Sequence, residues 1–233
     1  MPKKAKPKKI KVKPKKAKPK KKTKPRTKIK VKPKQATKPK KQTPKRKSAT
    51  KKFDLKPFVA KEFTSNQDAW KYVLVYFREN LPMILAQSRE PQCVVFDIDH
   101  TVTIPYPDHR EITSLFVLPL YNLFRFYKIP IYFVTARPLF SFNMQATKDE
   151  LAHFGFIGYA GLAMIPPQTD VRAFKLGERN RLRQTYNILF NVGDEWTDLT
   201  AEPVPSKYTR SMLLRHLEPR SEWSLKLVKS AIL

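Results

Sequence analysis

The sequence of 233 residues is poor in cysteine and has no long apolar run. Its one cysteine, Cys93, excludes an internal disulfide framework and fits a reducing compartment. Because Cys93 lies in an apolar stretch, we expect a buried, unreactive thiol. No stretch reaches the roughly 18 apolar residues of a membrane span, and the N-terminus lacks the apolar segment of a secretory signal. We therefore expect a soluble, intracellular protein with no membrane partner.

Acidic and aromatic residues are both missing from residues 1–52. This segment holds 27 of the 48 Lys and Arg residues, none of the 19 Asp and Glu residues, and eight prolines, and it repeats the fragment KIKVKPK. Residues 53–233 are left with 21 basic and 19 acidic residues, which is close to neutrality. Like charges and prolines keep a chain extended and deprive it of a core. We therefore predict a disordered basic tail over residues 1–52, followed by one folded domain over residues 53–233.

The charge of the tail indicates a polyanionic partner. We expect contact with DNA or RNA phosphates without sequence preference, and the missing aromatics argue against stacking on single-stranded bases. A nuclear-import signal, for which PKKKTKPR and PKRK would serve, and a solubilising arm are the alternatives. A nuclear or nucleic-acid-associated location is thus compatible with the tail.

From Phe53 onward the sequence alternates between strand and helix patterns. Continuous apolar, β-branched runs predict buried strands, and apolar residues at helical spacing predict helices. The predicted strands are 93–98, 130–137, 159–165 and 187–195. The predicted helices are 65–80, 111–129 with a kink or break at Pro119, 142–156 and 174–186. This alternation predicts an α/β fold with a parallel sheet, and the short intervals leave no room for a large cap domain.

Polar side chains follow three of these strands, at the edge where open parallel sheets bind ligands. They are Asp97, Asp99, Thr135, Asp194 and Asp198, and Lys175 lies on the helix before the last strand. Singly, each has an ordinary interpretation: the aspartates and the threonine as caps of a helix or loop, and the lysine as a solvated helix residue. Together, carboxylates and a lysine at one edge are costly unless a cation and an anion share the site. A Mg²⁺ ion facing a phosphate satisfies that requirement.

The order and spacing of these residues resemble the haloacid dehalogenase (HAD) superfamily of phosphotransferases. DIDHT (97–101) is similar to the first motif, D-x-D-x-T, and VTAR (134–137) to the second. Lys175 falls where the third motif has its lysine, and GDEWTD (193–198) is similar to the fourth, G-D-x-x-x-D. NVGDEWTDL and FKLGERNRL look like subfamily IIIB, the class B-type acid phosphatases. The resemblance implies a Rossmann-like three-layer fold without a large cap, a phosphomonoester substrate and Mg²⁺ as cofactor.

The resemblance also implies a role for each matched residue. Asp97 is the expected nucleophile, which forms an aspartyl-phosphate, and Asp99 the expected acid and base. Thr135 and Lys175 are expected to hold the phosphoryl oxygens. The residues expected to hold Mg²⁺ are Asp97, Asp194, the backbone carbonyl of Asp99 and, as a ligand or behind the ligands, Asp198. His100 departs from the family pattern, where a Glu is usual, and we expect little effect because strand alternation would turn it away from the site.

The sequence therefore supports two functions of different classes. The first is a Mg²⁺-dependent phosphomonoester phosphatase whose basic tail binds nucleic acid or another polyanion. The second is a nucleic-acid-binding protein built on a HAD scaffold that has lost its activity. The intact set of four motifs favours the enzyme.

Overall fold

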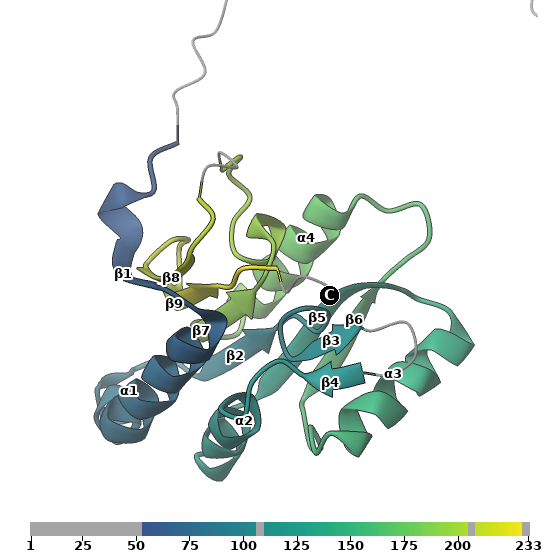
Figure 1. Cartoon of the computed structure of the whole chain (residues 1–233), viewed down its shortest axis with the longest axis horizontal. Coiled ribbons are helices and arrows are strands. Elements are labelled where there is room, and N and C mark those ends of the chain that lie inside the picture. Colours follow the sequence, from purple (N-terminus) through teal and green to yellow (C-terminus); the bar gives the residue numbers. More distant parts are fainter. Residues whose placement is uncertain (1–52, 106–109, 205–207, 230–233) are drawn as a thin grey trace, which may run out of the picture. The chain divides into compact units, whose positions relative to one another are not determined.

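The computed structural model describes residues 53–105, 110–204 and 208–229. Their main sheet has seven strands, in the spatial order β1-β8-β9-β7-β2-β5-β6 (Figure 1). The strands are β1 (Val59–Phe63), β2 (Gln92–Phe96), β5 (Ile131–Pro138), β6 (Gly161–Ile165), β7 (Asn187–Gly193), β8 (Ser211–Arg215) and β9 (Ser221–Lys226). The predictions made for residues 1–52, including the tail and its boundary, lie outside the described residues.

The helices and the smaller elements connect these strands. The helices are α1 (Asn66–Gln87), α2 (Val117–Phe126), α3 (Ser141–His153) and α4 (Val171–Arg183). A separate two-stranded hairpin, β3 (Thr103–Pro105) with β4 (Arg110–Ile112), comes directly after the first motif. Two short 3₁₀ helices are η1 (Lys56–Phe58) and η2 (Trp196–Asp198). Every helix or strand predicted from the sequence has a counterpart, although several boundaries differ.

The predicted parallel sheet is confirmed for its central strands. β9, β7, β2, β5 and β6 pair in parallel, whereas β8 and β1 extend one edge antiparallel. In the central register, Phe96 of β2 lies opposite Phe133 of β5 and Val192 of β7. The carboxyl ends of these three strands therefore meet at one edge of the sheet, which is where the polar motif residues follow.

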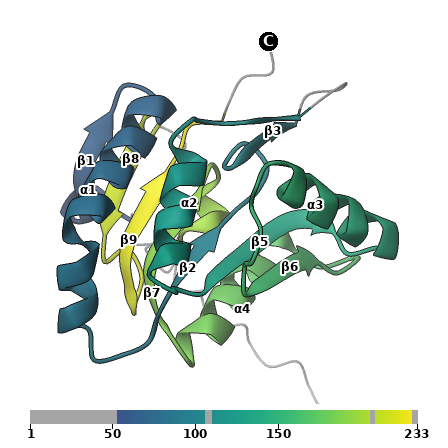
Figure 2. The same cartoon turned by 90° about the horizontal axis from the view of Figure 1, so that it is seen from below.

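Helices cover both faces of the sheet, which makes the predicted three-layer arrangement (Figure 2). On one face α1, α2 and α3 bury an aromatic core that includes Trp70, Phe96 and Phe124. On the other face, Leu182 of α4 packs against Val95 of β2. Adjacent residues of a strand point to opposite faces, so β2, which is buried along its whole length, supplies both cores at once. Each fully buried aromatic side chain contributes about 1.5–3 kcal/mol or more to this packing.

Two of the helix boundaries that differ from the predictions concern proline. Helix α1 begins as predicted, with Ser65 accepting a hydrogen bond from the Asp68 amide, but it continues through Pro82 to Gln87. Leu81 beside that proline is fully buried, and this packing offsets the lost backbone hydrogen bond. The predicted helix 111–129 begins only at Val117, so Pro119 lies in the first turn. Amides of a first turn have no partner within the helix, so a proline is tolerated there.

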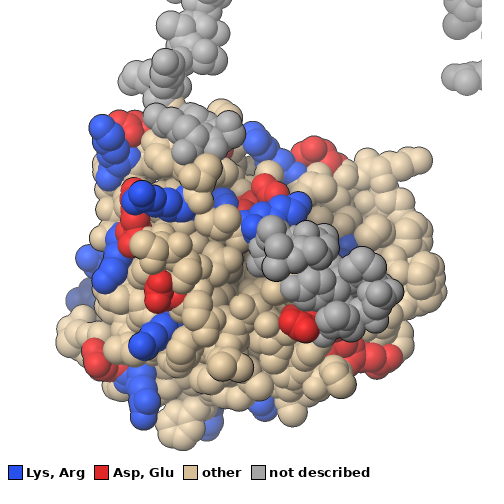
Figure 3. Space-filling model, in the orientation of Figure 1, with Lys and Arg blue, Asp and Glu red and all other residues tan. Residues whose placement is uncertain are grey.

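The surface of the described residues carries charges of both signs. Lys and Arg side chains alternate with Asp and Glu over the face shown in Figure 3, as the near-neutral composition of residues 53–233 predicts. Among the described residues, no helix has both the length and the apolar character needed to cross a bilayer.

Candidate active site

The site lies where β2, β5 and β7 end. Asp97 follows β2 directly, and its amide donates to the Val192 carbonyl at 3.0 Å, which ties it to the neighbouring strand. Thr135 lies in the last part of β5, and Asp194 follows β7. All three side chains are buried. The predicted convergence of the motif residues at one sheet edge is therefore present in the structure.

Three aspartates form what we call the carboxylate cluster: Asp97, Asp194 and Asp198. One carboxylate oxygen from each lies within 4.8 Å of the others, and all three residues are buried. Oxygen ligands in such a group suit a hard divalent cation. The side chain of Asp99 is not a member of this cluster; its predicted metal contact, through the backbone carbonyl, stays a prediction.

Lys175 reaches the carboxylate cluster from helix α4 on the far face of the sheet. Its Nζ donates to Asp97 Oδ1 at 2.8 Å and also contacts Asp198 Oδ1, and the residue is only 4% exposed. The ordinary interpretation of Lys175 as a solvated helix residue is therefore wrong. Burial lowers the pKa of Lys175, but the charges of Asp97 and Asp198 outweigh that effect and raise it above its ordinary value. The lysine thus stays charged.

Two buried ammonium groups, Lys175 and Lys226, act on these three buried carboxylates and do not neutralise them. Burial, reinforced by the charge of Asp198, raises the pKa of Asp97 well above its usual range, although Lys175 opposes the shift. Burial and the charges of Asp198 and Glu195 raise the pKa of Asp194 to about 7. Excess negative charge at a buried site favours either protonation or a bound cation. The donor set and its charge therefore fit a divalent metal ion.

The turn of the fourth motif depends on Gly193. A Cβ atom at this position would lie 2.2 Å from the Cβ of Asp198, so a larger residue would displace the aspartate. Asp198 Oδ2 also accepts a hydrogen bond from the Glu195 amide at 2.9 Å. The ordinary interpretation of Asp198 as a cap is thus correct, and the same carboxylate contacts Lys175 through its other oxygen.

Two buried side chains hold the backbone of Asp198 in place. Its carbonyl accepts hydrogen bonds from Asn191 Nδ2 at 2.8 Å and from Arg179 Nη1 at 2.9 Å. Arg179 lies one turn after Lys175 on the same face of α4 and also contacts Glu218. Sequence reasoning missed both supporting residues, although the spacing of four between Lys175 and Arg179 was visible.

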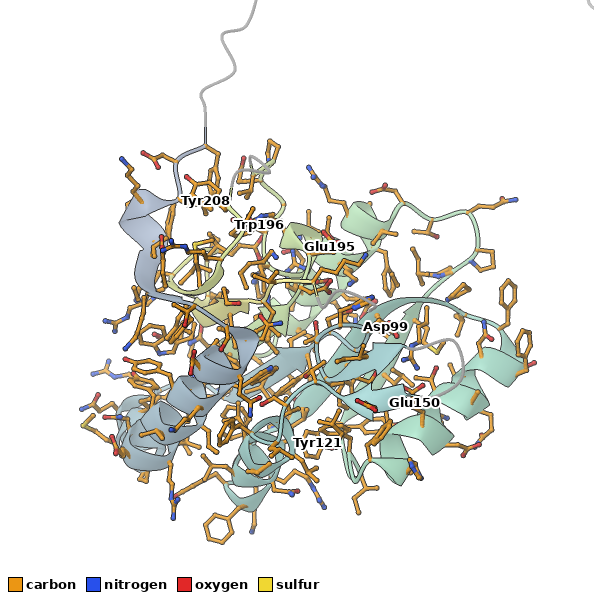
Figure 4. The ribbon with its side chains drawn as sticks, viewed as in Figure 1. Asp99, Tyr121, Glu150, Glu195, Trp196 and Tyr208 are labelled. Atoms are coloured by element: carbon orange, nitrogen blue, oxygen red, sulfur yellow. The ribbon has the colours of Figure 1, made fainter. Side chains whose placement is uncertain are left out.

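A second group of charges, which we call the Arg137 cluster, lies beside the first and consists of Asp99, Arg137 and Glu150. Arg137 donates to both oxygens of Asp99, at 2.9 and 2.8 Å, and to both oxygens of Glu150, at 2.8 and 2.9 Å. The Asp99 side chain is 31% exposed, against 11% for Arg137 and 12% for Glu150. Figure 4 shows Asp99 above the strand ends and Glu150 on α3. The acid and base candidate therefore faces solvent and is held in a bidentate ion pair.

Arg137 was not predicted as a site residue, although a signal for it was present. It lies two residues after Thr135 in the second motif, VTAR, at the end of the same strand. The Arg137 amide also donates to Thr135 Oγ1 at 3.2 Å. Glu150 carried no such signal, because the pattern of α3 gives no hint of a partner far away in sequence.

The reason given for dismissing His100 was wrong. Strand β2 ends at Phe96, so strand alternation does not extend to residue 100. His100 instead adopts a positive φ of 58° in the turn after Asp99, where it is buried. Its amide donates to the Thr103 carbonyl at 2.7 Å, which helps to close the turn. The small effect expected of His100 stays a prediction.

Lys226 is a further residue that the sequence did not reveal, because strand β9 was not predicted. It is buried, its Nζ donates to the backbone carbonyls of Asp194 and Leu227, and it lies 5.4 Å from the centre of the Trp196 ring. Trp196 in turn packs edge-on against Tyr208, and Figure 4 labels both residues. Burial lowers the pKa of Lys226. The lysine fixes the backbone that presents Asp194.

Comparison with known proteins supports this description. Residues 117–217 match the family model for the HAD superfamily, subfamily IIIB (acid phosphatase). The matched segment contains Thr135, Lys175, Asp194 and Asp198, whereas Asp97 and Asp99 precede it. Over that segment the resemblance stated from the motifs is confirmed. No curated protein is significantly similar to the chain.

Among the solved structures that are similar to the chain are two of acid phosphatases. One is the class C acid phosphatase from Bacillus anthracis, at 17% identity and a TM-score of 0.47, which covers 59% of this chain and 66% of that one. The other is the same kind of enzyme from that organism with tungstate bound, at 18% identity and a TM-score of 0.46, which covers 59% and 67%. This chain thus spans about two thirds of the length of those proteins.

Proposed function

We propose that the chain is a Mg²⁺-dependent phosphomonoester phosphatase that works through an aspartyl-phosphate on Asp97. The observation that carries this proposal is the carboxylate cluster, in which Lys175 pairs with Asp97 and Asp198 and three buried carboxylates outnumber the ammonium groups near them. A bound Mg²⁺ would balance this charge and polarise a phosphoryl oxygen. Asp97, Asp194, the Asp99 carbonyl and Asp198 are the groups that would hold it.

Asp97 is suited to attack because its carboxylate is fixed in place. Thr101 Oγ1 donates to Asp97 Oδ2 at 3.1 Å, and Lys175 holds the other oxygen. In the first step an Asp97 oxygen bonds to phosphorus, the bond to the leaving oxygen breaks, and Asp99 gives that oxygen its proton. In the second step Asp99 takes a proton from water, the water oxygen bonds to phosphorus, and Asp97 is released as a carboxylate.

Charge that develops on the phosphoryl oxygens needs donors already in place. Lys175 supplies a buried ammonium, and Thr135, in the second half of β5, is only 1% exposed. Because both side chains are held by packing on rigid elements, they need little reorganisation when charge develops. These are the roles we assign to Thr135 and Lys175.

Hydrolysis of 4-nitrophenyl phosphate tests the enzymatic proposal. We expect turnover by the full chain with Mg²⁺, loss of turnover with a chelator, and recovery when Mg²⁺ is restored in excess. Asp194→Asn should lower activity strongly, while the same change at the exposed Asp149 should leave it unchanged. A well-folded chain with no turnover at any Mg²⁺ concentration would favour the alternative, a nucleic-acid-binding protein on an inactive scaffold.

For residues 1–52 we propose sequence-independent binding of DNA or RNA, on the basis of 27 positive and no negative side chains. Even 6–10 phosphate contacts would cost about 10³–10⁵ in affinity between 50 and 200 mM salt. Retention of mixed-sequence DNA should therefore fall steeply with salt for the full chain and be nearly lost when residues 1–52 are deleted. An unchanged salt slope after the deletion would show that the tail is not the binding element.

A further inference from the structure

A pocket of about 290 Å³ lies between the end of β5 and helix α3. The described residues that line it are Arg137, Pro138, Asn143, Ala146, Thr147 and Glu150. Its volume is close to the lower end of the range of about 300–1,000 Å³ that small-molecule sites occupy. Neither Asn143 nor Ala146 has a role in the chemistry described above, so the pocket is a feature that the proposed reaction leaves unexplained.

Arg137 connects this pocket to the reacting atoms. One edge of its guanidinium, through Nε and Nη2, donates to Asp99, whereas Nη1 donates to Thr147 at 3.2 Å and to Glu150 at 2.8 Å. The pocket wall is thus separated from the Asp99 carboxylate by the width of one guanidinium group. Asp99 must contact the leaving oxygen in order to protonate it. A leaving group that extends from that oxygen along Arg137 enters the pocket.

The lining of the pocket is rich in groups that form hydrogen bonds. The guanidinium of Arg137, the amide of Asn143, the hydroxyl of Thr147 and the carboxylate of Glu150 all border it, and its remaining described walls are the small residues Pro138 and Ala146. Arg137 already donates to Glu150 and Thr147, and Asn143 Nδ2 donates to the Pro138 carbonyl. A hydroxyl that accepts one hydrogen bond can still donate one, and amide and carboxylate oxygens accept more than one. Hydroxyl groups of a leaving group can use this remaining capacity and an apolar leaving group cannot, so the wall favours a leaving group with hydroxyl groups.

The wall is also fixed before any ligand binds. In the loop that joins β5 to α3, the Leu139 amide donates to the Ile165 carbonyl at 2.7 Å. Asn143 Nδ2 donates to the Pro138 carbonyl at 3.2 Å, which ties the start of α3 back to the strand. A ligand that enters this pocket need not order the loop, so more of its contact energy appears as affinity.

From these observations we propose that the pocket between Arg137 and α3 binds the leaving group of the substrate, and that it selects a small polyhydroxylated leaving group such as a sugar. This inference rests on the proposed phosphatase function and specifies its substrate class. Arg137 then has two contacts of consequence: it positions Asp99 against the leaving oxygen, and it forms the wall against which the rest of the leaving group lies.

The test measures binding without requiring turnover. Full-length chain carrying Asp97→Asn is titrated by calorimetry, in the presence of Mg²⁺, with ribose 5-phosphate, phenyl phosphate and inorganic phosphate. We expect ribose 5-phosphate to bind at least tenfold more tightly than phenyl phosphate. Ala146→Trp, which fills the pocket from an exposed helix position, should weaken ribose 5-phosphate at least tenfold and leave inorganic phosphate unchanged. Ala152→Trp places the same side chain on α3 outside the pocket and should change nothing.

A second variant tests the pocket without introducing a larger side chain that could disturb folding. Asn143→Leu keeps the approximate volume but removes the amide, so it should weaken ribose 5-phosphate severalfold while phenyl phosphate binds as before. If Ala146→Trp and Ala152→Trp bind ribose 5-phosphate equally, or if phenyl phosphate binds as tightly as ribose 5-phosphate, the pocket assignment is wrong. Suppose that the Asp97→Asn chain binds ribose 5-phosphate tightly and that Ala146→Trp weakens this binding, but the unsubstituted chain hydrolyses neither ester. The pocket assignment would then stand, and the proposed phosphatase function would be wrong. Absence of binding by all three ligands would overturn both.

Discussion

The carboxylate cluster and the Arg137 cluster lie side by side at one sheet edge, yet they balance their charges differently. In the carboxylate cluster three aspartates outnumber the two ammonium groups that act on them, Lys175 and Lys226, and all of these side chains are nearly inaccessible to solvent. In the Arg137 cluster one guanidinium makes bidentate contacts with two carboxylates, and one of these, Asp99, is about a third exposed. Water screens the excess charge of the second cluster but not that of the first.

This difference separates two tasks. A buried group with uncompensated charge is ready for a cation and for the phosphoryl group that the cation helps to hold. A carboxylate that is open to solvent and held in position by Arg137 can meet both a leaving group and a water molecule, as an acid and base must. The same residue type, aspartate, thus serves as metal ligand and nucleophile in one environment and as proton carrier in the other.

The largest expected effect comes from the nucleophile in the carboxylate cluster. Asp97→Asn keeps the shape of the side chain but removes the attacking charge, so kcat should fall by roughly 10⁴-fold or more. Steady-state hydrolysis of an aryl phosphate measures it, with circular dichroism as a check on folding. Turnover within tenfold of the unsubstituted chain would remove Asp97 from the reaction.

The next largest effect is expected from Asp194, on the free energy of unfolding of the metal-free protein. The pKa of Asp194 rises from its ordinary 3.8 to about 7 on folding, so the folded state is penalised at pH 7 and relieved as the pH falls toward 4. Asp194→Asn should raise the free energy of unfolding at pH 7 by up to ~4 kcal/mol. That advantage should disappear by about pH 4. Denaturant unfolding across this pH range provides the measurement.

A third effect is expected when Mg²⁺ is added to the unsubstituted chain and to Asp194→Asn. At 100 times its dissociation constant, a cation that binds only the folded state stabilises it by about 2.7 kcal/mol. Mg²⁺ should therefore raise the melting temperature of the unsubstituted chain at pH 7 and have almost no effect on Asp194→Asn. Equal stabilisation of both proteins would place the cation outside the carboxylate cluster.

The smallest effect is expected in the Arg137 cluster. Glu150→Gln preserves the size of the side chain but removes its charge, which weakens the ion pair with Arg137. Asp99 should then be held less firmly, and kcat should fall roughly tenfold. The loss should be larger for an alkyl phosphate, whose leaving group needs a proton, than for 4-nitrophenyl phosphate. Glu178→Gln, at a surface pair with Arg181, is the matched control and should have no effect. Equal losses with both substrates would indicate a merely structural role.

Much of the fold and of the carboxylate cluster could be predicted because the signal is local. The buried parallel strands are continuous apolar runs, and the motif residues follow directly where those runs end, as Asp97 follows Phe96. Strands β8 and β9, which lie between β1 and β7 in the sheet, were missed because their sequences, SMLLR and SEWSLK, are short and carry polar residues. Their pairing depends on partners distant in sequence, which a local pattern does not contain.

The Arg137 cluster escaped prediction for a similar reason. Arg137 and Asp99 are 38 residues apart, and Glu150 is a further 13 residues along on a helix. An ion pair of this kind is formed by the packing of α3 against the end of β5, not by a motif. Lys226 shows the same point, because its role depends entirely on the pairing of β9 with β7 at Gly193.

The measurement that tests the central claim most directly is single-turnover labelling of the Asp99→Asn variant. This variant keeps the nucleophile but lacks the acid and the base. With 4-nitrophenyl phosphate, whose leaving group needs little protonation, the first step should partly survive, whereas hydrolysis of the aspartyl-phosphate should be slow. Intact-mass detection should find an added phosphoryl group of about 80 Da, and peptide mapping should place it on Asp97. Absence of the adduct during measurable turnover, or its appearance on another residue, would contradict the proposed covalent mechanism.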